Sequence, residues 1–144
     1  MPRLLTFGVC QKAIVSKFDD SISMINLLFG CTVTLDDLIP IQDVAVPFEW
    51  AAVSAWLIES NDNNKTYEQK INIYYPNGAS AGESIIAFKF NARSHQNMIA
   101  SNNFPVGQAG EYILRLSVRE LANEEEEWKI VSEYPFEVIH IKKP

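Results

Sequence analysis

Short runs of alternating apolar and polar residues, separated by turn-forming residues, recur along most of this chain. Alternation with a period of two is typical of β-strands, because successive side chains of a strand point to opposite faces of a sheet. Regular spacing of such runs is typical of all-β sandwiches and barrels. Because no long stretch has a capped helical period, we expect at most one short helix, within residues 34–42.

The predicted strands cover residues 4–17, 22–35, 48–58, 67–75, 83–91, 110–118 and 128–141. The first two are expected to form an N-terminal hairpin around a turn at 18–21, and Gly30 is expected to mark a bulge in it. The sequence Pro76-Asn77-Gly78 gives the strongest turn signal. We expect a long connection at 36–47 and an irregular, Asn-rich segment at 92–109. The whole pattern predicts an immunoglobulin-like antiparallel β-sandwich of about seven to nine strands, forming one domain over residues 1–144.

The stretch FEWAAVSAWLI, Phe48 to Ile58, is apolar on both faces when it is drawn as a strand. A helix would place Trp50 and Trp56 about 120° apart, whereas a strand places them on one face. We therefore expect the aromatic face to point into the core. The opposite face, with its alanines and Val53, is expected to be covered by the N-terminal hairpin or by another subunit. The predicted core residues are Phe48, Trp50, Trp56, Tyr112, Leu114 and Leu116.

Residues 104–118, FPVGQAGEYILRLSV, predict a braced corner that leads into a central strand. Gly107 and Gly110 permit a sharp entry, and residues 113–118 alternate as a strand does. The ring of Tyr112 can be buried while its hydroxyl group reaches the backbone near the loop, an arrangement found in immunoglobulin-like sandwiches. This feature predicts a fold and carries no information on function.

The formal net charge of −6 and the absence of any basic run longer than two residues argue against nucleic acid and anionic membranes as partners. The apolar stretches are shorter than the roughly 20 residues of a membrane span. Residues 4–10 also lack the features of a secretory signal, so we expect a cytoplasmic protein. In that compartment Cys10 and Cys31 are expected to be separate free thiols, although a bridge is possible if they lie on paired strands.

Residues 78–82, GASAG, match the G-x-S-x-G pattern of the nucleophile elbow in α/β-hydrolases. That elbow joins a strand to a helix, but residues 83–91 alternate as a strand does, so a hairpin loop is the preferred interpretation. A small serine hydrolase that uses Ser80 with His95 or His140 is kept as an alternative. Cys10 is a poor nucleophile candidate because burial in an apolar strand raises the pKa of a thiol.

Metal and nucleotide sites have little support, because the two histidines and two cysteines have no ligand spacing and no glycine-rich phosphate loop is present. No cofactor is therefore expected. Alternating strand directions would place Asp19, Asp20, Asp62 and Glu124–Glu127 at one end of the sandwich. A calcium-binding sandwich is the second alternative, although solvated acidic loops explain the same residues.

Several stretches resemble a family of small bacterial proteins that contain a domain of unknown function. They are LLTFGVCQKAIV with SISMINLLFGCTV, VPFEWAAVSAWL, and FPVGQAGEYILRLSVRE leading to EEWKIVSEYPFEV, and together they cover most of the chain. Family members carry a cysteine shortly before a hydrophobic hairpin strand, as Cys10, Ile14 and Val15 do here, and often a Gly-Lys turn that FDDS replaces. The resemblance implies a compact immunoglobulin-like or related β-sandwich and transfers no catalytic residue.

The absence of a catalytic constellation predicts a protein that is not an enzyme. We expect a module that binds another protein or itself, because apolar residues occupy both faces of predicted strands. The expected contacts are the apolar edge around Leu4, Phe7 and Phe29 and the loop that carries Phe104 and Pro105.

Overall fold

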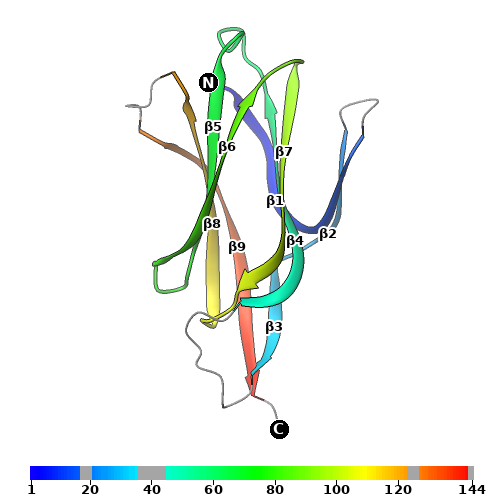
Figure 1. Ribbon diagram of the computed structural model, residues 1–144, viewed down its shortest axis with the longest axis vertical. Helices are drawn as coiled ribbons and strands as arrows, with labels where there is room; N and C mark the ends of the chain where they lie inside the picture. The colour runs from blue at the N-terminus through cyan, green and yellow to red at the C-terminus, as the bar shows by residue number, and fades with distance from the viewer. Residues whose placement is uncertain (17–20, 36–44, 123–126, 143–144) are drawn as a thin grey trace.

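The computed structural model describes residues 1–16, 21–35, 45–122 and 127–142, and they form two β-sheets packed face to face (Figure 1). The strands are β1 (Arg3–Val15), β2 (Ile22–Leu27), β3 (Gly30–Leu35), β4 (Ala45–Leu57), β5 (Thr66–Tyr74), β6 (Ser80–Lys89), β7 (Ser94–Pro105), β8 (Gly110–Glu120) and β9 (Lys129–Lys142). No helix occurs in these ranges. The prediction of an all-β chain is confirmed for the described residues.

The two sheets differ in size and in strand direction. One has four strands in the order β2-β1-β4-β7, and the other has five in the order β3-β9-β8-β5-β6. All strand pairs are antiparallel except β3 and β9, which are parallel from Gly30↔Glu137 to Leu35↔Lys142. The expectation of a purely antiparallel sandwich is therefore wrong at this one pair.

The core lies between the sheets and is rich in aromatic rings. The side chains buried to less than 2% exposure include Trp56, Tyr67, Phe104, Tyr112, Leu114, Leu116 and Phe136. Trp50 is 6% exposed, and Phe48 is partly buried against the same cluster. The aromatic face of β4 thus points into the core as predicted, and all six predicted core residues belong to the core.

The opposite face of β4 is covered by the N-terminal hairpin. Ala51 and Val53 are 3% and 0% exposed, and Ala13, Ile22 and Met24 of the β1–β2 pair pack against them. One of the two alternatives for this face is therefore confirmed. In Figure 1 the hairpin curls outward from the sheet that contains β4.

Tyr112 braces the entry to β8 as predicted. Its ring is fully buried, and its hydroxyl group donates a hydrogen bond to the carbonyl oxygen of Gln108 at 2.9 Å. The same hydroxyl oxygen accepts a bond from the backbone N–H of Gln108 at 3.1 Å. Both bonds join the start of β8 to the loop that follows β7.

Residues 22–35 do not form one strand, which corrects the prediction of a simple hairpin. The backbone N–H of Leu28 donates to the carbonyl oxygen of Val9 in the first sheet, and the carbonyl oxygen of Phe29 accepts from Glu137 in the second. The chain therefore changes sheets between these two residues. Gly30 does not mark a bulge but begins β3 at the crossing, where a Cβ atom would lie 2.2 Å from the carbonyl oxygen of Glu137.

The segment 92–109 is not irregular, because residues 94–105 form β7 along the whole length of β4. Asn and Ser favour turns in isolation, but pairing with a neighbouring strand and burial of one face decide strand formation here. Phe104 is fully buried and Ile99 is half-buried against the core, which stabilises the strand.

Some sequence predictions fall on residues outside the described ranges. Of the expected short helix at 34–42, residues 34 and 35 belong to β3 and the others are not described. Residues 18–20 of the expected hairpin turn are also outside the described part. Across the ranges that are described, no helix is long and apolar enough to cross a membrane.

Candidate binding surfaces

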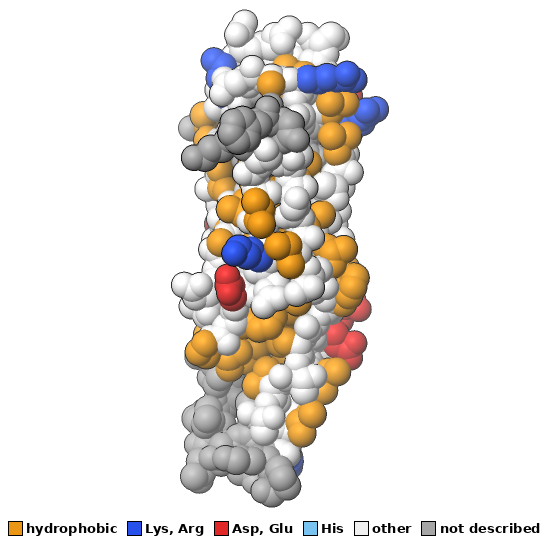
Figure 2. Space-filling model, turned by 90° about the vertical axis from the view of Figure 1, so that its right-hand side faces the viewer, with side chains coloured by type: hydrophobic (Ala, Val, Ile, Leu, Met, Phe, Trp, Pro, Cys, Tyr) orange, Lys and Arg blue, Asp and Glu red, His pale blue; other side chains and the backbone are white. Residues whose placement is uncertain are grey.

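A set of exposed apolar side chains lies on the N-terminal hairpin and just after it, and we call it the hairpin patch. Its members are Ile14, Ile25, Leu27 and Phe29, with exposures of 49%, 40%, 49% and 70%. Figure 2 looks onto the side of the molecule that carries the hairpin and shows several groups of hydrophobic side chains there, with a Lys or Arg and an Asp or Glu side chain beside them. Exposed apolar side chains that lie near one another are typical of contact sites.

The pairing of β1 with β2 brings the patch together. Ile14 pairs with Ser23 and Lys12 pairs with Ile25, so the two isoleucines are diagonal neighbours on one face of the hairpin. Ala13 and Met24 face the other way and pack against β4. The hairpin therefore buries one side and presents the other.

Phe29 is held in place although it is the most exposed member of the patch. Its ring stacks on that of Tyr134, with 6.4 Å between the centroids and 12° between the planes. The Tyr134 hydroxyl group donates to the carbonyl oxygen of Leu28 at 2.6 Å, which fixes both rings at the sheet crossing. A preorganised aromatic side chain loses little conformational entropy on binding.

The five contact residues predicted from the sequence do not form one surface. Leu4 and Phe7 are partly buried and pack against the core, and Phe104 is completely buried. Phe104 lies on the inward face of β7, so the prediction that it makes partner contacts is wrong. Pro105 lines a groove described next, and only Phe29 is widely exposed.

A groove of about 470 Å³ lies between the edge strands of the two sheets, β6 and β7. These strands leave their connection side by side and diverge toward the other end of the sandwich (Figure 1). The stacked rings of Phe88 and His95, 5.1 Å apart, lie near the connection. The apolar lining includes Trp50, Ala52, Ile71, Ile73, Ile99 and Pro105, and the polar lining includes Glu83, Ser84, Ser101 and Asn103.

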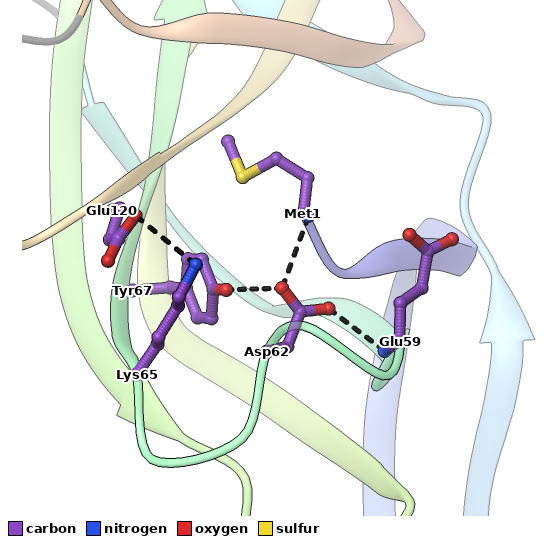
Figure 3. Close-up of polar contacts among 6 residues, drawn as sticks. All are labelled: Met1, Glu59, Asp62, Lys65, Tyr67 and Glu120. Carbon is purple, nitrogen blue, oxygen red and sulfur yellow. Dashed lines mark hydrogen bonds and ion pairs between the residues drawn. The ribbon is translucent and has the colours of Figure 1, made fainter.

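Asp62 lies in a buried polar cluster rather than in a solvated acidic loop (Figure 3). Asp62 is 1% exposed, and its Oδ2 atom accepts a hydrogen bond from the backbone N–H of Glu59 at 2.9 Å. Its Oδ1 atom accepts a bond from the hydroxyl group of Tyr67 and lies 3.1 Å from the amino group of Met1. Both carboxylate oxygens are therefore engaged within the protein.

This arrangement weakens the calcium alternative at its one described residue. Asp62 would have to give up internal bonds in order to bind an ion, and no group of three or more His, Cys, Asp or Glu residues with metal-site geometry occurs among the described residues. The other proposed ligands, Asp19, Asp20 and Glu124–Glu126, lie outside the described ranges, and Glu127 is exposed.

Asp62→Asn is expected to lower the free energy of unfolding by about 2 kcal/mol near pH 6, since hydrogen bonds to a charged group contribute roughly that much. Burial alone raises the pKa of the Asp62 carboxyl group, but bonds from Tyr67, the Glu59 amide and Met1 outweigh it, and the folded pKa lies below the ordinary 3.8. The stabilisation is present above pH 3.8 and is lost as the pH falls through the lower folded pKa.

Urea unfolding of the parent protein and of Asp62→Asn at several pH values between about 6 and 3 measures this effect. The difference in unfolding free energy should shrink toward the acid end. A difference that stays constant over this range would show that the Asp62 charge does not stabilise the fold.

Ser80 does not meet a histidine. Its hydroxyl group donates to Oδ1 of Asn72 at 2.9 Å, at the start of β6. His95 stacks on Phe88, eight residues further along β6, which corresponds to roughly 26 Å of strand. The Nε2 atom of His140 is 2.6 Å from the carbonyl oxygen of Val106. The structure does not bring Ser80, His95 and His140 together.

Five polar side chains form a buried network that joins the two sheets. Oε1 of Gln69 accepts bonds from Oγ of Ser54 at 2.6 Å, Nε1 of Trp56 at 3.1 Å and Nδ2 of Asn97 at 2.8 Å. Nε2 of His95 lies 2.8 Å from Oδ1 of Asn97. The Nε2 atom of Gln69 is buried without a hydrogen-bond partner. The network is structural, because its centre is enclosed by the core.

Cys10 and Cys31 are free thiols, as predicted. They lie on β1 and β3, which belong to different sheets. Burial raises the pKa of both thiol groups, so neither is activated as a nucleophile at neutral pH.

Sequence reasoning found Phe29 but missed the groove and the free edge of β7. The usable signal was the composition of residues 94–105, which contain no Lys, Arg, Asp or Glu. The described residues define a two-sheet β-sandwich with two candidate contact surfaces, which are the hairpin patch and the groove between β6 and β7. Comparison with protein-family models and with curated proteins finds no match to the chain.

Proposed function

We propose that the protein is a non-enzymatic interaction module with an immunoglobulin-like β-sandwich, and that its hairpin patch contacts a partner protein. The observation that carries the proposal is the exposure of Ile14, Ile25, Leu27 and Phe29 on an element whose other face packs against β4 through Ala13, Ile22 and Met24. Apolar and aromatic side chains at the centre of an interface provide most of the binding energy in protein complexes.

The strand order supports the immunoglobulin-like part of the proposal. In that fold strands A, B and E share one sheet and strands C, F and G share the other. Here β1, β4 and β7 share one sheet, and β5, β8 and β9 share the other. The bonds of the Tyr112 hydroxyl group to Gln108 match the tyrosine corner of these domains. The parallel β3–β9 pair and the outer strand β2 would be additions to the common pattern.

The patch also has the physical character of a contact surface. Burying an exposed apolar side chain stabilises a complex by about 25 cal/mol for every Å² of apolar surface that is removed from water. A partner with an apolar surface would recover this energy with little ordering cost, since Phe29 already stacks on Tyr134. The local charge is low, and Lys12, which pairs with Ile25, would favour an acidic rim on the partner.

A photo-crosslinking amino acid placed at Leu27, in the cells that naturally produce the protein, tests the proposal. We expect a discrete crosslinked adduct with a second protein, because position 27 would lie inside the interface. The matched control is the same amino acid at Ile130 of β9, whose exposure of 53% is close to the 49% of Leu27.

The adduct should be absent from the Ile130 control and should decrease when Ile25→Lys is added to the protein that carries the crosslinker at position 27. The same adducts from both positions, or none from Leu27, would contradict the proposal. Circular dichroism of each variant would show that the β-sandwich is retained.

A further inference from the structure

The two sheets end in four edge strands, and three of them carry features that discourage pairing with another chain. β2 and β3 have only six residues each. β6 contains two charged residues, Glu83 and Lys89, and Gly82 with a φ of 151° beside a register shift in its pairing with β5. Short length, charge and irregularity are the usual means by which natural edge strands avoid unwanted pairing.

β7 is the exception among these four edges. It has twelve residues, Ser94–Pro105, with no glycine, no Lys, Arg, Asp or Glu, and a proline only at its last position. The pairing of β4 with β7 changes register between Pro47 and Trp50. Over this stretch β4 advances by three residues while β7 advances by two, from Asn103 to Ser101, so the extra residue belongs to β4. β7 is therefore regular, and among the described strands it has a neighbour on one side only.

We propose that β7 pairs in antiparallel register with β7 of a second copy of this chain, so that two four-stranded sheets become one eight-stranded sheet. In an antiparallel strand every second residue directs its N–H and C=O groups away from its neighbour. A second β7 would satisfy these groups over most of the strand. The two-fold axis would lie near the middle of the strand, beside Ile99.

Charge is the reason for choosing a second copy as the occupant. A protein with a net charge of −6 repels itself through most surfaces, but two β7 strands would meet without any Lys, Arg, Asp or Glu side chain between them. A two-fold interface places each residue type opposite residues of the same strand. Asn102 and Asn103 are exposed on β7, and an amide side chain both donates and accepts hydrogen bonds, so these two can bond to polar side chains of the second copy.

The groove supports the same contact. Ile99, Ser101 and Asn103 of β7 line it, and Glu83, the only charged residue among the described residues of the lining, lies across the groove on β6. A second β7 would extend the wall of this groove with uncharged side chains. On the other face, Met98 is 43% exposed and would become buried near its counterpart.

Sedimentation equilibrium of the purified chain over a range of concentrations tests the proposal. The mass should rise from 16.3 kDa toward twice that value as the concentration increases. Met98→Lys should raise the dimer dissociation constant by more than about tenfold, because two like charges would meet near the axis. The matched control, Ile85→Lys on the other long edge strand, starts from a similar exposure of 47% and should leave the dimer unchanged.

A charge-reversal experiment separates loss of pairing from loss of folding. Met98→Lys and Met98→Glu should each be monomeric alone and should associate when mixed, which an unfolded variant could not do. A parent protein that stays monomeric up to about 100 μM would overturn the proposal. So would a dimer that Met98→Lys leaves intact, or a monomer that pairs only with an unrelated extended peptide.

Discussion

Gly30→Ala is expected to lower the free energy of unfolding by about 3 kcal/mol or more, equivalent to roughly 10 °C in melting temperature for a chain of this size. The added Cβ atom would lie 2.2 Å from the carbonyl oxygen of Glu137 and 3.1 Å from its carbonyl carbon. Both are backbone atoms of β9, so no side-chain rotation can relieve the contact. The parallel pair β3–β9 would have to separate at its first residue.

Gly8→Ala is the matched control for this substitution. Gly8 also lies in a strand, but its added Cβ atom would meet only side chains, the nearest being Cδ2 of Leu27 at 3.5 Å. That is ordinary van der Waals contact, so the melting temperature should change by no more than about 3 °C. Equal losses for the two variants, measured by thermal unfolding, would show that the close approach of Gly30 to Glu137 is not the cause.

Gln69→Leu is expected to destabilise the fold by about 3 kcal/mol, because three buried donors lose their common acceptor. These donors are Oγ of Ser54, Nε1 of Trp56 and Nδ2 of Asn97. Leucine fills a similar volume but accepts no hydrogen bond, so its apolar packing offsets only part of the loss. Denaturant unfolding gives the difference in free energy.

Ser54→Ala provides the graded control for the same network. It removes one donor to Gln69, while Nε1 of Trp56, which is also 3.2 Å from the Ser54 hydroxyl oxygen, keeps its bond to Gln69. The expected loss is about 1 kcal/mol. If Gln69→Leu proves no more harmful than Ser54→Ala, Oε1 of Gln69 is not the centre of the network.

Local pattern was sufficient to predict the faces of β4 and the role of Tyr112. In both cases the information lies in neighbouring residues, since alternation fixes the face of a strand and a tyrosine can reach the backbone of the preceding loop. The all-β class follows from the same alternation repeated along the chain. Ser54 and Gln69 are polar residues at core-facing positions of their strands, and that is the signal from which their network could have been found.

Other features depend on contacts between distant parts of the chain. The break at Leu28–Phe29 is decided by hydrogen bonds to Val9 and Glu137, which no local pattern contains. β7 was missed because its Asn and Ser residues favour turns, whereas β4 supplies the pairing. Asp62 lies in a loop as predicted, but its burial could not be foreseen because its partners Tyr67 and Met1 come together only in the folded chain. The contact residue Phe104 was misplaced for the same reason.

The parallel pairing of β3 with β9 joins two segments more than one hundred residues apart, since Gly30 meets Glu137. Closing such a long loop delays folding, and domains dominated by distant pairings fold in milliseconds to seconds. During synthesis, β3 and β8 cannot pair with β9 until β9 has left the ribosome. Until β9 pairs with it, one edge of β8 in the nascent chain is unpaired, and an unpaired strand edge is open to mispairing with other chains.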